Sequence, residues 1–154
     1  MKIKDFKIIT LLPQDFSKCS NIWDLKKHKA MAEKFYNELV SGERITFVYI
    51  ENEEYIGEVS LVFDNEDRDY TIPSQRIYLS RLIVKNEYRR HGIGTQLCEY
   101  AFQYAKENGY IEVSIGVDLD NFAALKLYQR LGFDRIIFVG EDTDGKYIKL
   151  MKIL

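Results

Sequence analysis

The chain has 154 residues, of which 46% are hydrophobic, and its 11 tyrosines and nine phenylalanines provide enough apolar surface for a buried core, which excludes a disordered chain. Its net charge of −2 gives no basic surface for nucleic acid, and no apolar stretch is long enough for a signal peptide or a membrane span. We therefore expect a cytoplasmic protein without nucleic-acid or membrane partners and, because Cys19 and Cys98 lie in no Cys/His cluster, without a metal site.

The first half of the chain predicts a strand, a helix and a hairpin. Residues 6–12 form a short apolar strand. From about residue 21 to 40, charged residues alternate with an apolar line at helical spacing, and Gly42 closes this helix. Residues 44–50 and 55–63 are rich in β-branched and aromatic side chains and are separated by four residues, which predicts an antiparallel hairpin.

The second half predicts alternating strands and helices after an acidic loop. Its elements are a strand at 76–84, a helix at 92–108, a strand at 110–117, a short helix opened by Asn121 and closed at Gly132, and two strands at 133–139 and 146–154. The strand–helix–strand unit requires two parallel strands, whereas the flanking hairpins are antiparallel. We therefore expect a single α/β (α+β) domain, with a mixed, mostly antiparallel sheet, a central parallel β-α-β unit and helices on both faces.

Ligands of open α/β sheets bind beyond the carboxyl ends of parallel strands, which here precede residues 85–95 and 118–128. In the first segment, Gly92 and Gly94 would admit a phosphate to the free N–H groups of a helix start. The basic residues beside them oppose the helix dipole, and a bound polyanion would turn this conflict into attraction. The alternative is an ordinary surface helix with incidental arginines. The spacing fits neither a P-loop nor a dinucleotide fingerprint.

The second segment, "NFAALKLYQRLGF" at 121–133, places an amide and a phenol on one helical face. Asn121 and Tyr128 lie about 10 Å apart along the axis, and Ala124 between them leaves room for a slim ligand. The alternative is that Asn121 is only an N-cap and Tyr128 only a core aromatic residue.

Together, the two segments resemble a known family. "RRHGIG" at 89–94 matches the R/Q-x-x-G-x-G/A acetyl-CoA signature of the GNAT superfamily of N-acetyltransferases, and 121–133 is similar to its N-x-x-A-x-x-x-Y-x-x-x-G-F motif. The resemblance implies a GNAT-like domain over 1–154. It also implies an acyltransferase with acetyl-CoA as co-substrate, which acetylates a primary amine of a small molecule, or of a peptide or protein, by direct attack.

The resemblance also implies roles for individual residues. The backbone of the strand end would pair with the pantetheine arm, and Asn121 and Ala124 would contact the cofactor. Tyr128, with the ordinary tyrosine pKa near 10, would act as general acid to the departing thiolate. The pantetheine-pairing residues are Leu82, Ile83 and Val84, and those whose N–H groups would hold the pyrophosphate are Arg89, Arg90, His91, Gly92, Ile93, Gly94 and Thr95.

The general base is where this sequence departs from the family pattern. Many members carry a glutamate on the central strand, where this chain has Tyr78 or Ser80. Glu58 on the neighbouring strand is our first candidate and Asp118 the second, although either carboxylate can instead be structural. Arg81 is expected either to pair with Glu58 or to clamp an acidic group of the acceptor.

The missing strand glutamate leaves a second function class open. A non-catalytic module that senses acetyl-CoA would keep the cofactor motifs without the base. The acceptor amine is not specified by the motifs, and since members of the family are often dimeric, a homodimer remains an alternative to a monomer.

Overall fold

A computed structural model describes residues 5–154, which form a seven-stranded mixed sheet in the order β1-β2-β3-β4-β5-β7-β6. The strands are β1 (Phe6–Thr10), β2 (Arg44–Glu51), β3 (Glu54–Val62), β4 (Arg76–Val84), β5 (Glu112–Asp118), β6 (Arg135–Asp142) and β7 (Gly145–Ile153). The α-helices are α1 (Lys29–Ser41), α2 (Ile93–Glu107) and α3 (Phe122–Arg130), and two 3₁₀ helices, η1 and η2, span Pro13–Asn21 and Asn86–Tyr88. The predicted mixed α/β sheet is confirmed: β4 and β5 are parallel, whereas β1–β2, β5–β7 and β6–β7 are antiparallel.

The residues of the sheet fall into two compact units. The first contains Met1–Leu61 and Arg81–Ala101, and the second contains Val62–Ser80 and Phe102–Leu154. The division falls within β3, β4 and α2, so each unit holds one part of the central strand β4. Within the described part of the chain, no helix is long and apolar enough to cross a membrane.

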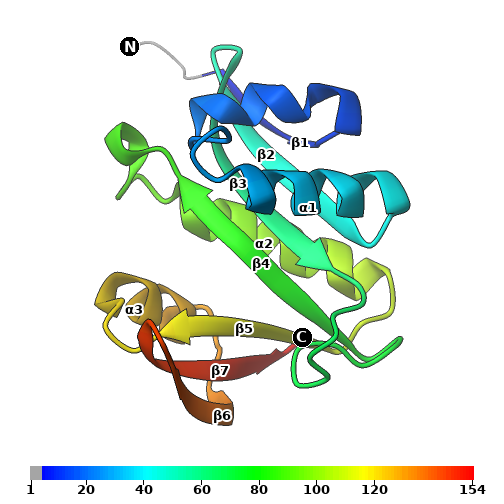
Figure 1. Ribbon diagram of the computed structural model, residues 1–154, viewed down its shortest axis with the longest axis vertical. Coiled ribbons are helices and arrows are strands. Elements are labelled where there is room, and N and C mark those ends of the chain that lie inside the picture. The colour runs from blue at the N-terminus through cyan, green and yellow to red at the C-terminus, as the bar shows by residue number, and fades with distance from the viewer. Residues whose placement is uncertain (1–4) are drawn as a thin grey trace. The chain divides into compact units, whose positions relative to one another are not determined.

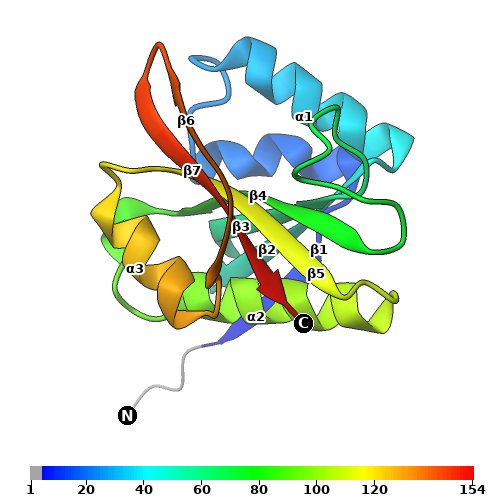
Figure 2. The ribbon, with the colours of Figure 1, turned by 90° about the horizontal axis from the view of Figure 1, so that it is seen from below.

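In the first unit, α1 and α2 cover opposite faces of the sheet formed by β2 and β3 (Figures 1 and 2). Gly57 explains the close approach of α2, because a Cβ atom there would lie 3.2 Å from Leu97 Cδ1 and 3.3 Å from Ile93 Cγ2. The other face carries a buried cluster that includes Cys19 and Trp23. The expected hairpin is tighter than predicted: Asn52 and Glu53 alone connect β2 to β3, both with positive φ.

The predicted start of the first helix near residue 21 was wrong. Residues 13–21 form the 3₁₀ helix η1, and α1 begins at Lys29. The Asp24 side chain accepts hydrogen bonds from the backbone N–H groups of Lys26 and Lys27 at 3.1 and 3.0 Å, which stabilises a turn instead of a continuous helix. The predicted end is confirmed, since Gly42 adopts φ 84° just after Ser41.

In the second unit, Lys149 fixes the acidic loop between β3 and β4 onto β7. Its Nζ lies 2.6 Å from Asp67 Oδ2 and 2.9 Å from Asp69 Oδ2, and the lysine side chain is buried. Tyr70 in the same loop stacks on Tyr78 at a centroid distance of 4.2 Å. Two of the loop's carboxylates are therefore already paired with a buried lysine, although they remain partly exposed to solvent.

The contact of Tyr70 with Gly116 on β5 gives a test of this packing. A Cβ atom at Gly116 would overlap the Tyr70 hydroxyl, so Gly116→Ala is expected to lower the free energy of unfolding by about 1–3 kcal/mol, measured by urea denaturation. Tyr70→Phe removes the overlapping oxygen, so the double variant should recover part of the loss. Equal destabilisation with and without the hydroxyl would contradict the steric explanation.

Candidate functional site

The carboxyl end of β4 and the residues after it form the first candidate segment. The ladder between β4 and β5 pairs residues 76–78 with 112–114, and it therefore ends before Leu82. Leu82, Ile83 and Val84 are only half-buried, although they belong to a central strand. The sequence analysis predicted that this backbone pairs with the pantetheine arm of acetyl-CoA. That role stays a prediction.

The loop from β4 to α2 combines two positive φ angles with the start of a helix. Arg90 and Gly92 have φ of 67° and 79°, and α2 begins at the next residue, Ile93. A Cβ atom at Gly92 would meet open space, so a ligand can approach the peptide there. The first-turn N–H groups of α2 have no acceptor within the helix and carry its positive dipole end. These features fit a pyrophosphate group.

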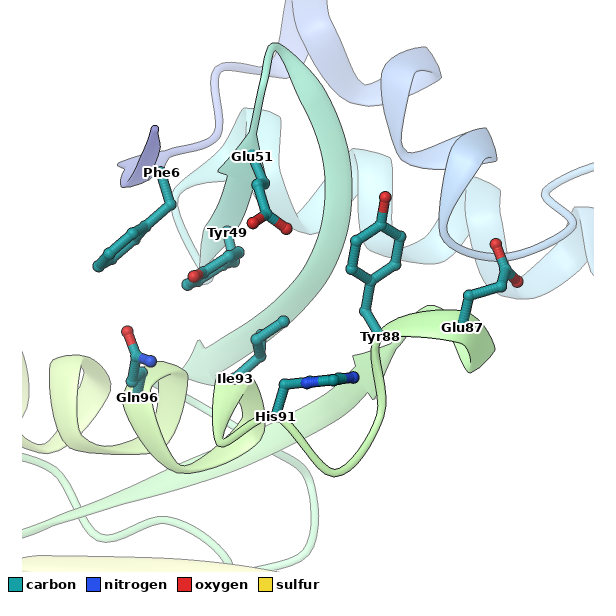
Figure 3. A pocket seen from close by; sticks show the side chains of 8 residues that line it. All are labelled: Phe6, Tyr49, Glu51, Glu87, Tyr88, His91, Ile93 and Gln96. Carbon is teal, nitrogen blue, oxygen red and sulfur yellow. The ribbon is translucent and has the colours of Figure 1, made fainter. Parts of the chain in front are cut away.

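The three basic side chains of this loop are used differently. Arg89 Nε donates a hydrogen bond to the Val84 carbonyl at 3.1 Å, which ties the loop to the end of β4. Arg90 is exposed to solvent. His91, whose N–H group was assigned to the pyrophosphate, directs its side chain into a separate cavity (Figure 3). The basic residues of the motif therefore have different roles: Arg89 ties the loop to β4, whereas the side chain of His91 lines a cavity.

The second candidate segment lies in the other unit. Asn121 is the N-cap of α3, and its side-chain oxygen accepts a hydrogen bond from the Ala124 N–H at 3.2 Å. Tyr128 is buried, and its ring packs against Phe133 at a centroid distance of 5.6 Å and an interplanar angle of 77°. The structure thus shows the two structural roles that the sequence analysis gave as alternatives: Asn121 is an N-cap, and Tyr128 is a buried aromatic residue. The cofactor roles of Asn121, Ala124 and Tyr128 stay predictions.

Glu58 on β3 is the centre of a buried polar cluster in the first unit. Its side chain is 3% exposed, and its Oε1 accepts a hydrogen bond from Trp23 Nε1 at 2.6 Å. The buried Cys19 thiol lies near this carboxylate. The guanidinium carbon of Arg81 lies 4.5 Å from the centroid of the Trp23 ring. A cavity of about 720 Å³, lined in part by residues 20–26, adjoins Trp23.

The environment of Glu58 suits a proton acceptor at neutral pH. Burial raises the pKa of Glu58 to about 7, and the Trp23 hydrogen bond and the charges of Arg81 and Arg44 limit this rise. A general base is most effective when its pKa lies near the working pH. Cys19 is not a nucleophile here, because burial and the charge of Glu58 raise the pKa of its thiol.

Arg81 reaches this cluster through a backbone feature that the sequence did not reveal. Its φ of 61° interrupts the regular alternation of β4, so the alternation rule could not place its side chain. Burial lowers the pKa of Arg81, and the charge of Glu58 opposes this shift. The charges of the two residues thus influence each other, but the expected pairing stays a prediction, and within residues 5–154 the Arg81 Nε has no hydrogen-bond acceptor.

Sequence reasoning did not connect Trp23 and Cys19 with Glu58. Both precede Glu58 by 35 residues or more, so no local pattern joins them. The one available signal was that Trp23 is the single tryptophan of the chain. The second candidate base, Asp118, ends β5 in the other unit and is exposed.

Known proteins are similar to this chain in sequence. "N-alpha-acetyltransferase 30" of Schizosaccharomyces pombe is 34% identical over 90 residues, which are 58% of this chain and 57% of that protein. The "Probable N-acetyltransferase san" of Drosophila melanogaster is 26% identical over 136 residues, 84% of this chain and 68% of that protein. The chain thus matches little more than half the length of the yeast relative.

Two solved structures have the same fold at lower identity. The ribosomal-protein-S18-alanine N-acetyltransferase of Escherichia coli superposes with a TM-score of 0.76 at 18% identity, covering 97% of this chain and 94% of that one. The PaiA N-acetyltransferase of Thermoplasma acidophilum, solved in complex with coenzyme A, gives a TM-score of 0.73 at 20% identity over 97% and 99%. The family model described as "Acetyltransferase (GNAT) family" matches residues 8–133. The chain belongs to the GNAT family of acetyltransferases.

Proposed function

We propose that this protein is a cytoplasmic N-acetyltransferase that transfers the acetyl group of acetyl-CoA to a primary amine, with residues 1–154 as one catalytic domain. The yeast relative is named an N-alpha-acetyltransferase and the Escherichia coli structure a ribosomal-protein-S18-alanine N-acetyltransferase, which favours the α-amino group of a peptide or protein as acceptor. A small-molecule amine is the other acceptor class, since an aminoglycoside 6'-acetyltransferase has the same fold with a TM-score of 0.73.

Buried Glu58 is the observation that carries the proposal. An acetyl-CoA sensor needs the cofactor loop, but it has no need of a carboxylate whose pKa is raised to about 7 by burial. Trp23 joins this carboxylate to the cavity lined by residues 20–26, where an acceptor amine would enter. The Trp23 N–H donates a hydrogen bond to this carboxylate, and the charges of Arg81 and Arg44 favour its ionised form, which supports a role as a positioned base.

In the proposed reaction acetyl-CoA supplies an activated acyl group, and the chain's own residues bind, orient and move protons. Glu58 removes a proton from the ammonium of the acceptor, directly or through a water. The neutral amine attacks the carbonyl carbon, so that a C–N bond forms and the C–S bond breaks. A backbone N–H near Ile83 stabilises the oxyanion. Tyr128 gives a proton to the departing thiolate, and its phenolate takes up the second proton that the acceptor nitrogen loses, so that the amide and the free thiol of coenzyme A result.

Release of free thiol from acetyl-CoA in the presence of defined amines tests this proposal. The panel contains peptides that differ in their first residue, the same peptides with blocked N-termini, lysine-containing blocked peptides, polyamines and an aminoglycoside. We expect release with free α-amines and none with the blocked peptides. Release only with small molecules would overturn the acceptor class. Binding of acetyl-CoA without release for any amine would overturn the activity and favour the sensor.

A further inference from the structure

Glu54, the first residue of β3, is the centre of a polar network that the mechanism above does not use. Its Oε1 accepts a hydrogen bond from Asn21 Nδ2 at 3.0 Å and lies 2.9 Å from Lys85 Nζ, and its Oε2 accepts one from the Tyr88 hydroxyl at 3.3 Å. All four residues belong to the first unit. One carboxylate thus receives donors from three segments: the end of η1, the residue after β4 and the end of η2.

The network is also tied to β3 by backbone hydrogen bonds. Asn21 Nδ2 donates to the Tyr55 carbonyl at 2.7 Å, and the Lys85 N–H donates to the Ile56 carbonyl at 2.8 Å. The hydrogen bonds from Asn21 and then from Lys85 lower the pKa of Glu54, which favours its ionised form. A single exposed ion pair contributes little, but a carboxylate shared by several donors belongs to a network that can fix the position of its members.

The two ends of the network reach the two candidate binding regions. Asn21 lines the cavity of about 720 Å³ that the proposed function gives to the acceptor amine. On the other side, Lys85 and Tyr88 bracket η2, and the "RRHGIG" segment follows directly. Figure 3 shows the Tyr88 ring standing on the loop that leads into α2. The Tyr88 N–H donates to the Lys85 carbonyl at 2.9 Å, so the two side chains hold a closed turn at the entrance to the cofactor loop.

We propose that Glu54 is a positioning residue of the transferase, which holds the wall of the acceptor cavity and the cofactor loop in the arrangement that both substrates require. This role rests on the proposed function. Glu54 acts through Asn21 on the acceptor side and through Lys85 and Tyr88 on the cofactor side, and it takes part in no proton transfer. Its loss should therefore weaken the binding of both substrates and leave the chemical step unchanged. Glu58 acts in the chemical step, so the effects of these two glutamates of β3 are separable.

Glu54→Gln tests this role, because it removes the negative charge with little change in shape. We expect the Kd for acetyl-CoA, measured by calorimetry without an acceptor, to rise about three- to tenfold, since charge-assisted hydrogen bonds become neutral ones. The KM of a free-amine peptide from the thiol-release panel should rise by a similar factor. The kcat under saturating substrates should stay within about twofold of the wild type. A merely structural role would lower the active fraction, and hence kcat, without changing Kd or KM.

Variants of the donors separate the two sides of the network. Asn21→Ala should raise the KM of the peptide about three- to tenfold and leave the Kd for acetyl-CoA unchanged, whereas Tyr88→Phe should raise that Kd about twofold and leave KM unchanged. Glu53→Gln is the matched control, because it removes the same charge one residue earlier, at an exposed position, and it should change neither value. Thermal unfolding of each variant checks that it is folded.

The outcomes distinguish this role from the proposed function. A Kd and a KM that change no more in Glu54→Gln than in Glu53→Gln would overturn the positioning role and leave the activity standing. A fall in kcat alone would overturn it as well. If the wild type binds acetyl-CoA but releases no thiol with any amine, the proposed activity fails, and the Kd of Glu54→Gln still decides the cofactor side. Absence of acetyl-CoA binding to the wild type would overturn both.

Discussion

Tyr128→Phe is expected to lower kcat by about 10²- to 10⁴-fold, the range typical of a lost general acid, with little change in the Kd for acetyl-CoA. The phenylalanine keeps the aromatic ring that packs edge-on against Phe133, so the core of the second unit is preserved. Only the hydroxyl that would protonate the thiolate is removed. The measurements are thiol release under saturating substrates and calorimetric titration with acetyl-CoA.

Tyr110→Phe is the matched control for this variant. Tyr110 also lies in the second unit, beside Phe63 at a centroid distance of 6.2 Å, and it belongs to neither cofactor motif. Its kcat should remain close to that of the wild type. If Tyr128→Phe also retains the wild-type kcat, Tyr128 is not the general acid. The role of Tyr128 would then be the packing of its ring against Phe133.

Glu58→Gln should lower kcat/KM by a similar factor, because glutamine cannot accept the proton of the acceptor ammonium. In the wild type, kcat/KM should rise with pH through an apparent pKa of about 7, as Glu58 becomes ionised. Trp23→Phe removes the hydrogen bond that stabilises the charged carboxylate, so this limb should move to higher pH. A limb that stays in place in Trp23→Phe would contradict the assignment.

Folding stability distinguishes loss of the base from loss of the fold. The pKa of Glu58 is higher in the folded chain than its usual value of 4.5, so the folded state binds the proton more tightly. The wild type therefore loses stability as pH rises from about 4.5 to about 7. Glu58→Gln lacks this titration and should be the more stable protein above pH 7. Asp118→Asn is the second control; if it is inactive while Glu58→Gln is active, Asp118 is the base.

The local elements were largely predictable from the sequence, and the failures have identifiable causes. The bounds of β4 match the predicted 76–84, since apolar and β-branched residues fill that segment. The start of α1 was predicted too early, because the apolar spacing of residues 21–28 is satisfied equally well by a turn that Asp24 caps. A competing local hydrogen bond, and not a missing apolar pattern, decided that boundary.

For the candidate site, too, the local features could be predicted from the sequence and the long-range ones could not. The two glycine-containing motifs announce a cofactor loop and a capped helix because helix starts and N-caps depend on residues close in sequence. The environment of Glu58 depends on Trp23 and Arg81, which are separated from it by 35 and 23 residues. Burial, which raises its pKa, is a property of the packed sheet and has no local sequence signal.

The sequence by itself determined the order of strands and helices, the parallel β-α-β unit and the family to which the chain is similar. These follow from short-range periodicity and from residue types that special backbone conformations require. The tertiary structure alone decided that Arg81 turns at a positive φ toward Trp23, that Glu58 is buried beside them, and that His91 faces an aromatic, acidic cavity. The charge state of a side chain depends on which distant residues exclude water from it, and only the folded chain brings those residues together.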